Sequence, residues 1–122
     1  MKSKITTTNA PVPAGPYSQA IVWGDHVYVA GQGPLDPATG KTAPDVAGQT
    51  RQVLTNIKNI LGAAGVSMDN VVKVSAYLAD MKYFSEFNEV YKQFFNEPYP
   101  VRTTVGAQLN AILVEIDVIA RK

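Results

Sequence analysis

Two ionisable side chains in the last quarter of the chain are of types that could carry out chemistry together. Arg102 opens the β-branched run 102–105, and Glu115 lies in the middle of the most apolar run of the protein, residues 112–120. Burying an unpaired carboxylate costs several kcal/mol, so the position of Glu115 needs an explanation. An arginine can hold an anion, and a glutamate can move a proton or orient a water molecule. The pair therefore outlines a small enzyme site, which the rest of the chain has to position.

Size and composition narrow the possible functions. The 122 residues predict one domain, 1–122, that is long enough to bury its own core. Charged residues make up 17% and the formal net charge is +1, so nothing points to nucleic acid as a partner. The absence of cysteine excludes disulfides, a thiol nucleophile and cysteine metal sites. The single His26 falls in a predicted turn, where we expect it to be solvated, and we expect no metal site.

The N-terminal segment gives no sign of export or membrane insertion. Residues 1–6 include basic side chains but no apolar stretch follows them. Nowhere does the chain approach the run of ~18 apolar residues that a membrane-spanning helix needs. We therefore expect no signal peptide and no membrane span, and a cytoplasmic location.

Hydrophobic periodicity and the positions of Gly and Pro predict the elements that hold these residues. Strands are expected over 3–7, 18–23, 26–31, 71–78, 102–108 and 111–120, and helices over 46–64 and 81–96. Asp45 and Asp80 suit helix N-caps, and Gly65 suits a C-terminal cap. The proline-rich segment 8–17 is expected to be an extended loop, and Gln49 to lie mostly off the apolar stripe of the first helix. This order predicts an α+β fold, a mixed sheet of five or six strands with both helices on one face.

The last predicted strand has two faces of different character. One face is wholly apolar and is expected to lie under the helices: Ile112, Val114, Ile116, Val118 and Ala120. The opposite face carries Glu115 and Asp117 beside the large apolar Leu113 and Ile119. A solvated face of an antiparallel sheet usually alternates more cleanly than this. The mixture indicates a subunit interface and predicts a homo-oligomer with Glu115 near that interface.

Several segments, taken together, resemble the Rid/YjgF family of reactive intermediate imine/enamine deaminases, once described as translation-inhibiting ribonucleases. The resemblance covers essentially the whole chain and rests on residues 11–20, 30–32, 87–91, 100–102 and 114–116. It implies a chorismate-mutase-like fold and a homotrimer with active sites in clefts between subunits. It also implies hydrolysis of short 2-imino or 2-amino-2-alkenoic acids, such as 2-aminoacrylate and 2-iminobutanoate, to a 2-keto acid and ammonia. No cofactor is implied, and the role would be metabolite repair.

The same resemblance implies roles for individual residues. Arg102 would clamp the substrate carboxylate, because its planar fork matches a carboxylate bidentately. Glu115 would orient or deprotonate the water that attacks the imine carbon. Tyr17 would donate its hydroxyl or cap the pocket with its ring, and Gly31 would let backbone pass close to the ligand. The two remaining substrate-binding candidates are Thr104, through its backbone, and Asn88.

Three further residues or segments qualify this picture. Asp117 shares the face of Glu115 and is expected to be structural. Ala30 stands where relatives commonly carry serine, which removes one possible hydrogen bond to the substrate. The segment 107–111 is expected to be shorter than usual, which would reshape the rim of the cleft.

Two other functions remain open from the residues alone. An endoribonuclease would need a general acid–base pair and cationic stabilisation of phosphate, and the chain offers one histidine and a net charge of +1. A non-catalytic trimer that binds small carboxylic acids would use Arg102 equally well. Glu115 separates this binding protein from the deaminase, because a carboxylate sensor gains nothing from a second negative charge near its ligand.

Overall fold

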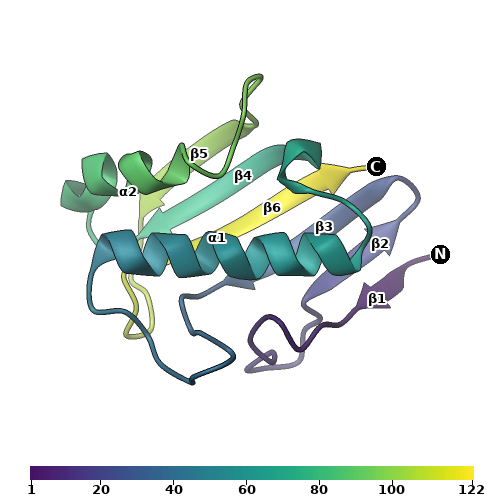
Figure 1. Ribbon diagram of the computed structural model, residues 1–122, viewed down its shortest axis with the longest axis horizontal. Coiled ribbons are helices and arrows are strands. Elements are labelled where there is room, and N and C mark those ends of the chain that lie inside the picture. Colours follow the sequence, from purple (N-terminus) through teal and green to yellow (C-terminus); the bar gives the residue numbers. More distant parts are fainter.

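The computed structural model describes residues 1–122 as one six-stranded sheet with both helices on the same face (Figure 1). The elements are β1 (Ser3–Ile5), β2 (Ala20–Trp23), β3 (His26–Gln32), α1 (Val46–Ala63), β4 (Val71–Leu78), α2 (Phe84–Tyr91), β5 (Val101–Gly106) and β6 (Val114–Arg121). The strand order is β1-β2-β3-β6-β4-β5, antiparallel except for the parallel pair of β4 and β5. This confirms the predicted α+β class, the mixed sheet and the placement of the helices.

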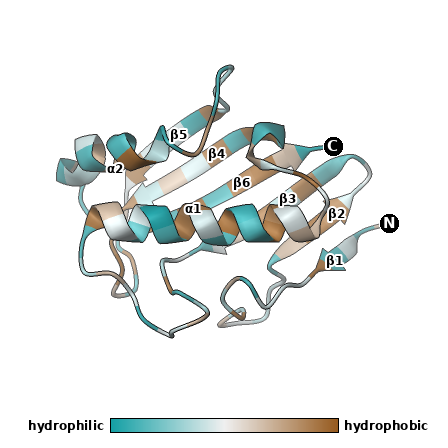
Figure 2. Cartoon of the chain, in the orientation of Figure 1, coloured by the Kyte–Doolittle hydropathy of each residue, from teal (hydrophilic) through white to brown (hydrophobic).

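Local signals account for the first helix. The Asp45 carboxylate accepts a hydrogen bond from the Gly48 N–H at 3.0 Å, which caps the N-terminus as predicted. Gly65 follows the C-terminus with a φ of +79°, the left-handed conformation that glycine adopts without strain. Apolar and polar residues alternate along α1 (Figure 2), and its buried apolar residues are Val46, Val53, Leu54, Ile57, Ile60 and Leu61. The helix forms because its ends are capped and its apolar stripe is buried in the core.

The two faces of the last strand are as predicted. Val114, Ile116, Val118 and Ala120 are buried beneath the helices, whereas Glu115 and Asp117 point to the other face. No helix covers that second face (Figure 1). We call it the outer face of the sheet.

Some boundaries differ from the prediction, most of all in the second helix. It was expected over 81–96, but the segment starts as the 3-10 turn Met81–Tyr83 and α2 ends at Tyr91. After Tyr91 the backbone hydrogen bonds span three residues instead of four, as from the Phe94 N–H to the Tyr91 carbonyl. This tighter turn lets Phe95 point into the core. The last strand was expected from 111 but starts at Val114, because Ala111 has a φ of 62° and cannot continue a strand.

The remaining strands differ by a few residues at their ends. The strand expected over 102–108 is Val101–Gly106, and the first strand is shorter than expected. None of the helices is both long and apolar enough to pass through a membrane. No cluster of three or more His, Asp or Glu side chains suits a metal ion.

Candidate functional site

Arg102 and Glu115 lie on opposite faces of the sheet. Arg102 pairs with the buried Val74 and points toward the helices, whereas Glu115 pairs with Tyr77 and points to the outer face. Paired residues of neighbouring strands share a face, so the register separates the two side chains. Each side chain therefore belongs to a different part of the chain's surface, and we describe the two as the arginine half and the glutamate half.

The arginine half is built on aromatic rings. The guanidinium carbon of Arg102 lies 4.5 Å from the centre of the Tyr91 ring and 5.4 Å from that of Phe87. It lies 5.6 Å from the centre of the Phe84 ring. Such contacts attract a cation and hold the guanidinium plane without using its N–H donors. The rings come from α2 and the arginine from the edge strand β5, so the packing of α2 on the sheet fixes the position of the guanidinium group.

The Arg102 guanidinium has no acidic partner in the chain. The only two ion pairs join Lys92 to Glu89 and Arg121 to Asp25. A surface salt bridge, the structural alternative to a substrate clamp, is therefore not formed. A half-buried guanidinium without an acidic partner is a ready receptor for a carboxylate.

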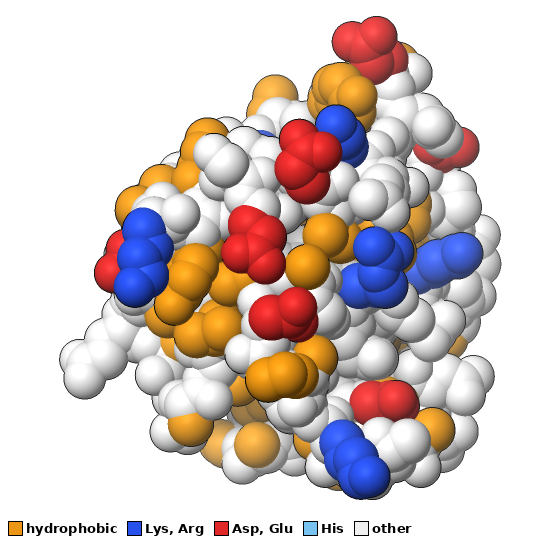
Figure 3. All heavy atoms as spheres, turned by 60° about the vertical axis from the view of Figure 1, so that its left-hand side comes forward, with side chains coloured by type: hydrophobic (Ala, Val, Ile, Leu, Met, Phe, Trp, Pro, Cys, Tyr) orange, Lys and Arg blue, Asp and Glu red, His pale blue; other side chains and the backbone are white.

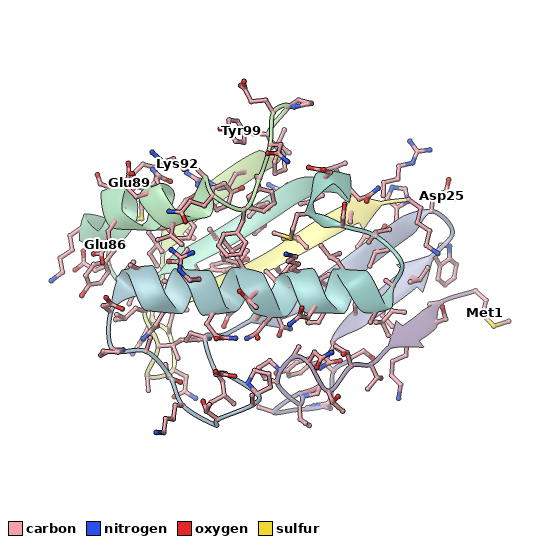
Figure 4. All side chains as sticks on the ribbon, in the orientation of Figure 1. Met1, Asp25, Glu86, Glu89, Lys92 and Tyr99 are labelled. Carbon is pink, nitrogen blue, oxygen red and sulfur yellow. The ribbon has the colours of Figure 1, made fainter.

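A hollow surrounds Arg102 and contains a second predicted residue. Its lining combines α2 with the loop before β5, and its residues are Asn88, Glu89, Tyr91, Lys92, Tyr99, Pro100 and Arg102. Glu89 and Lys92 project from α2, and Tyr99 lies on the loop that follows it (Figure 4). The structure thus brings Asn88 together with Arg102.

Two buried hydroxyls in the arginine half have no hydrogen-bond partner. They belong to Tyr91 and Thr104. Thr104 pairs with the buried Ala76 and so faces the helices, like Arg102. Burial raises the pKa of the Tyr91 hydroxyl to about 12, although the positive charge of Arg102 lowers it in part. Tyr91 therefore keeps its proton at neutral pH. It was not among the site residues expected from the sequence, where it fell within the predicted helix 81–96.

The glutamate half is organised by a β-bulge. In β3 the two residues Ala30 and Gly31 lie opposite the single Asp117 of β6, because the register shifts between Val29 and Gln32. A Cβ atom at Gly31 would lie 2.8 Å from Oε2 of Glu115. Only glycine leaves room for that carboxylate, so the structure brings Gly31 and Glu115 together. Ala30 contributes a methyl group to the bulge and no hydroxyl.

The Glu115 carboxyl is shifted toward its neutral form. Burial raises its pKa, and the negative charge of Asp117 raises it further. Asp117 itself accepts a hydrogen bond from the Tyr77 hydroxyl at 3.1 Å. This bond gives Asp117 a role within the sheet and supports the expectation that it is structural. A carboxyl with a raised pKa holds its proton to a higher pH than an ordinary glutamate, which favours a role in proton transfer.

Tyr17 lies on the same side of the molecule as Gly31. Both line one hollow, whose other walls are the proline-rich loop, residues 33–35, Thr42 and Ile112, and no Asp, Glu, Lys or Arg is among its lining residues. The Ala14 N–H donates to the Tyr17 hydroxyl oxygen at 3.1 Å, which leaves the hydroxyl hydrogen free to be donated. The structure therefore places Tyr17 and Gly31 on one hollow, with Gly31 also beside Glu115, and it groups Asn88 and Thr104 with Arg102.

Buried carboxamides hold the walls of that hollow, and sequence reasoning missed them. The Gln19 amide nitrogen donates to the Pro11 carbonyl at 2.9 Å and to the Thr7 carbonyl at 3.0 Å, which fixes the proline-rich loop. The Asn56 amide nitrogen donates to the carbonyls of Gly33 and Leu35 at 3.1 and 3.0 Å. Each bond satisfies a backbone carbonyl of a loop that would otherwise lack a hydrogen-bond partner. The hollow is thus a preformed feature.

Replacing Gly31 by alanine is expected to displace the Glu115 carboxylate while leaving the fold intact. The added methyl would meet the far end of a flexible side chain, which can rotate away, and Gly31 does not need a positive φ. We expect the melting temperature to change little and the rate of any reaction that uses Glu115 to fall about tenfold or more. Thermal unfolding and steady-state kinetics of Gly31→Ala measure the two effects. A variant with wild-type turnover would show that the position of this carboxylate does not matter.

Comparison with known proteins places the whole chain in one group of sequences and structures. A family model described as Endoribonuclease L-PSP matches residues 7–122. A RutC family protein of Pyrococcus horikoshii is 50% identical over 125 residues, covering 100% of this chain and 99% of that protein. A Bos taurus protein named 2-iminobutanoate/2-iminopropanoate deaminase is 45% identical over 119 residues, covering 95% of this chain and 87% of that protein.

The similarity extends to solved structures. The crystal structure of Escherichia coli TdcF with bound serine matches with a TM-score of 0.93 at 38% identity and covers 98% of each chain. The fold of this chain is therefore shared with that structure over almost its whole length.

Proposed function

The chain belongs to the Rid/YjgF family, and from this premise we propose that it is a hydrolytic deaminase of short 2-imino and 2-aminoalkenoic acids. Its substrates would include 2-aminoacrylate and 2-iminobutanoate, and its products would be a 2-keto acid and ammonia. The name of the bovine relative, 2-iminobutanoate/2-iminopropanoate deaminase, supports the substrate class. The observation that carries the proposal is the unpaired Arg102 guanidinium held on three aromatic rings, a receptor for a small carboxylate.

The two halves have complementary tasks in this reaction. Arg102 would bind the substrate carboxylate with two N–H donors and so fix the imine carbon in place. The carboxylate of Glu115 would take a proton from water as the oxygen attacks that carbon. Glu115 would return this proton to the carbinolamine nitrogen. As the C–N bond breaks and ammonia leaves, the hydroxyl proton would pass back to the Glu115 carboxylate, which leaves the C=O group of the keto acid. Water is the only other reactant, so the chemistry calls for no cofactor.

The separation of the two halves supports an active site shared between subunits. We propose a homotrimer of the chorismate-mutase-like type, in which Arg102 of one subunit meets Glu115 of the next. Within one chain the sheet lies between these side chains. The outer face also leaves large apolar side chains exposed, with Tyr28 45%, Val101 66% and Val105 42% accessible. Such a surface suits burial against another copy of the chain.

Mixing two inactive variants tests the shared site. Arg102→Ala and Glu115→Gln are each expected to have little activity, but subunits unfolded together and refolded as mixed trimers should regain it. Each mixed trimer has one interface with both residues intact, so an equal mixture should recover about a quarter of the wild-type rate. A mixture that stays as inactive as its components would show that the two residues do not act across an interface. Refolded wild type provides the matched control.

A coupled assay tests the reaction itself. A threonine/serine dehydratase would generate 2-aminoacrylate and 2-iminobutanoate in place, and keto-acid formation would be followed with and without the protein. Acceleration by wild type and not by Arg102→Ala would support the deaminase and its carboxylate clamp. A folded wild-type protein without effect on either imine would contradict the proposal.

A second candidate is non-catalytic binding of small carboxylic acids. The serine bound in the E. coli TdcF structure favours it, because serine carries the carboxylate that Arg102 could hold. Binding of amino or keto acids without acceleration of imine hydrolysis would support this candidate instead.

Endoribonuclease activity, the description of the family model, has less support from this surface. On the side that carries α2, acidic and basic side chains are intermingled and no continuous basic patch is present (Figure 3). His26 lies at the β2–β3 hairpin, where its ring stacks on Tyr28 at 6.0 Å, at the opposite end of β3 from Gly31. This side of the molecule therefore offers no cationic track of the kind that RNA binding uses.

A further inference from the structure

Gln49 of α1 is buried although it carries a polar side chain. It was expected mostly off the apolar stripe of its helix, but only 4% of it is accessible. The prediction was wrong because Gln49 shares its side of the helix with Val46, Val53 and Asn56, at the spacing that faces the sheet. A buried carboxamide is costly unless its oxygen and nitrogen are both bonded.

Both ends of the carboxamide bond to backbone outside the helix. The oxygen accepts from the Leu113 N–H at 2.8 Å, and the nitrogen donates to the Ala43 carbonyl at 2.9 Å. Leu113 was expected within the last strand on its outer face, but it precedes the strand and packs against the edge of the core. Its carbonyl accepts from the Ala79 N–H at 2.9 Å. The peptide groups on either side of Leu113 are therefore held by α1 on one side and by the end of β4 on the other.

These hydrogen bonds to Leu113 lie at the start of β6, the strand that carries Glu115. Ala111, with its φ of 62°, ends the preceding turn, and the ladder of β6 starts at Val114. Glu115 lies two residues after Leu113, about 7 Å along an extended chain. A slip of one residue at this entry would turn Glu115 from the outer face to the helix face. The Gln49 bond therefore acts where the register of β6 is decided.

We propose that Gln49 is a positioning residue for Glu115, which holds the entry of β6 so that the carboxylate stays beside Gly31 on the outer face. Gln49 touches no reacting group and acts through the Leu113 peptide. The geometric part of this inference stands on the structure alone, and only its consequence for turnover rests on the proposed function.

A titration of the Glu115 carboxyl by ¹³C NMR tests the geometric part. In the wild type its pKa is raised by burial and by Asp117, and Asp117 and Tyr77 are the titratable groups that face it. Gln49→Met keeps an unbranched side chain but removes both bonds, so the entry of β6 should loosen and water should reach the carboxyl. We expect the pKa of Glu115 to fall toward its ordinary value and the Leu113 amide to exchange faster. The Glu115→Gln variant assigns the signal.

Thr50→Val is the matched control. Thr50 is the next residue, is fully buried, and donates its hydroxyl only to the Val46 carbonyl of its own helix. This variant should leave both the titration of Glu115 and the exchange of the Leu113 amide unchanged. If Gln49→Met does not fold, Gln49→Asn, whose side chain is too short to span both bonds, is expected to shift the titration in the same direction.

Kinetics test the consequence for turnover. Gln49→Met should lower kcat about tenfold with a smaller effect on KM, because Arg102 lies on another strand and keeps its hold on the substrate carboxylate. In a Glu115→Gln background the same change should have no further effect on kcat. An unchanged Glu115 titration in folded Gln49→Met would overturn the inference, whether or not the protein deaminates imines. Absence of deamination in the wild type would instead contradict the proposed function and leave the titration to decide the inference.

Discussion

Replacing Arg102 by lysine is expected to raise KM for 2-iminobutanoate strongly and to lower kcat/KM at least tenfold, about 1.4 kcal/mol. Lysine keeps the positive charge but offers a single ammonium group in place of a planar fork, so it cannot pair with a carboxylate bidentately. It also fits the face of Tyr91 less well, where the guanidinium carbon lies 4.5 Å from the ring centre. Steady-state kinetics with enzymatically generated imine measure the change.

Arg51→Lys provides the matched control for this prediction. Arg51 lies on α1 and donates both terminal nitrogens to the Gln93 side chain at 3.3 Å, away from either half of the site. Its replacement should leave KM and kcat unchanged. Wild-type kinetics in Arg102→Lys would show that Arg102 does not clamp the substrate, and equal losses in both variants would point to a general effect of exchanging arginine for lysine.

The parts of the fold that local signals specify could be predicted from the sequence. The first helix was expected over 46–64 and is Val46–Ala63, because Asp45 and Gly65 mark its ends. The strand 71–78 was predicted with its observed bounds, since three valines and a tyrosine, residue types that favour strands, lie within it. The second helix was expected to be longer, because its aromatic residues keep helical spacing beyond Tyr91 even though the backbone turns inward there.

The arrangement of the site depends on pairing that is not local in the sequence. Alternation along β6 correctly placed Glu115 on the outer face, because that face follows from one strand alone. The face of Arg102 follows from its pairing with Val74 in the neighbouring strand. The Tyr91 ring beneath it comes from the packing of α2. Residue types therefore indicated the chemistry, whereas the division of the site into two halves required the structure.

Replacing Glu115 by glutamine is expected to lower kcat more than any other single change in the glutamate half, with much less effect on the binding of a keto-acid product. Glutamine keeps the shape of the side chain but cannot accept a proton from water. Burial and Asp117 raise the pKa of Glu115, so the carboxylate forms only at a higher pH than for an ordinary glutamate. The acidic limb of the wild-type pH–rate profile should therefore lie above the usual glutamate range, and Glu115→Gln should lack it.

The raised pKa of Glu115 also predicts how the stability of the folded protein depends on pH. Because the folded state holds the proton more tightly than the unfolded chain, stability present below the unfolded pKa of Glu115 is lost as the pH rises through its folded pKa. Glu115→Gln cannot ionise, so it should be at least as stable as the wild type at neutral pH, and this advantage should disappear in acid. Thermal unfolding across that pH range measures it. A kinetic loss that followed a drop in stability would instead assign Glu115 a structural role.

Asp117→Asn separates the effect of the Asp117 charge on the pKa of Glu115 from the role of Glu115 as the base. Removing the neighbouring charge should lower the pKa of Glu115 and move the acidic limb to lower pH, while the base itself stays in place. The Tyr77 hydroxyl donates to Asp117 at 3.1 Å in the wild type, and the side-chain oxygen of asparagine can accept the same bond in the variant. A limb that moves in Asp117→Asn and vanishes in Glu115→Gln identifies Glu115 as the titrating base. A limb that stays unchanged in both variants assigns the proton transfer to another group.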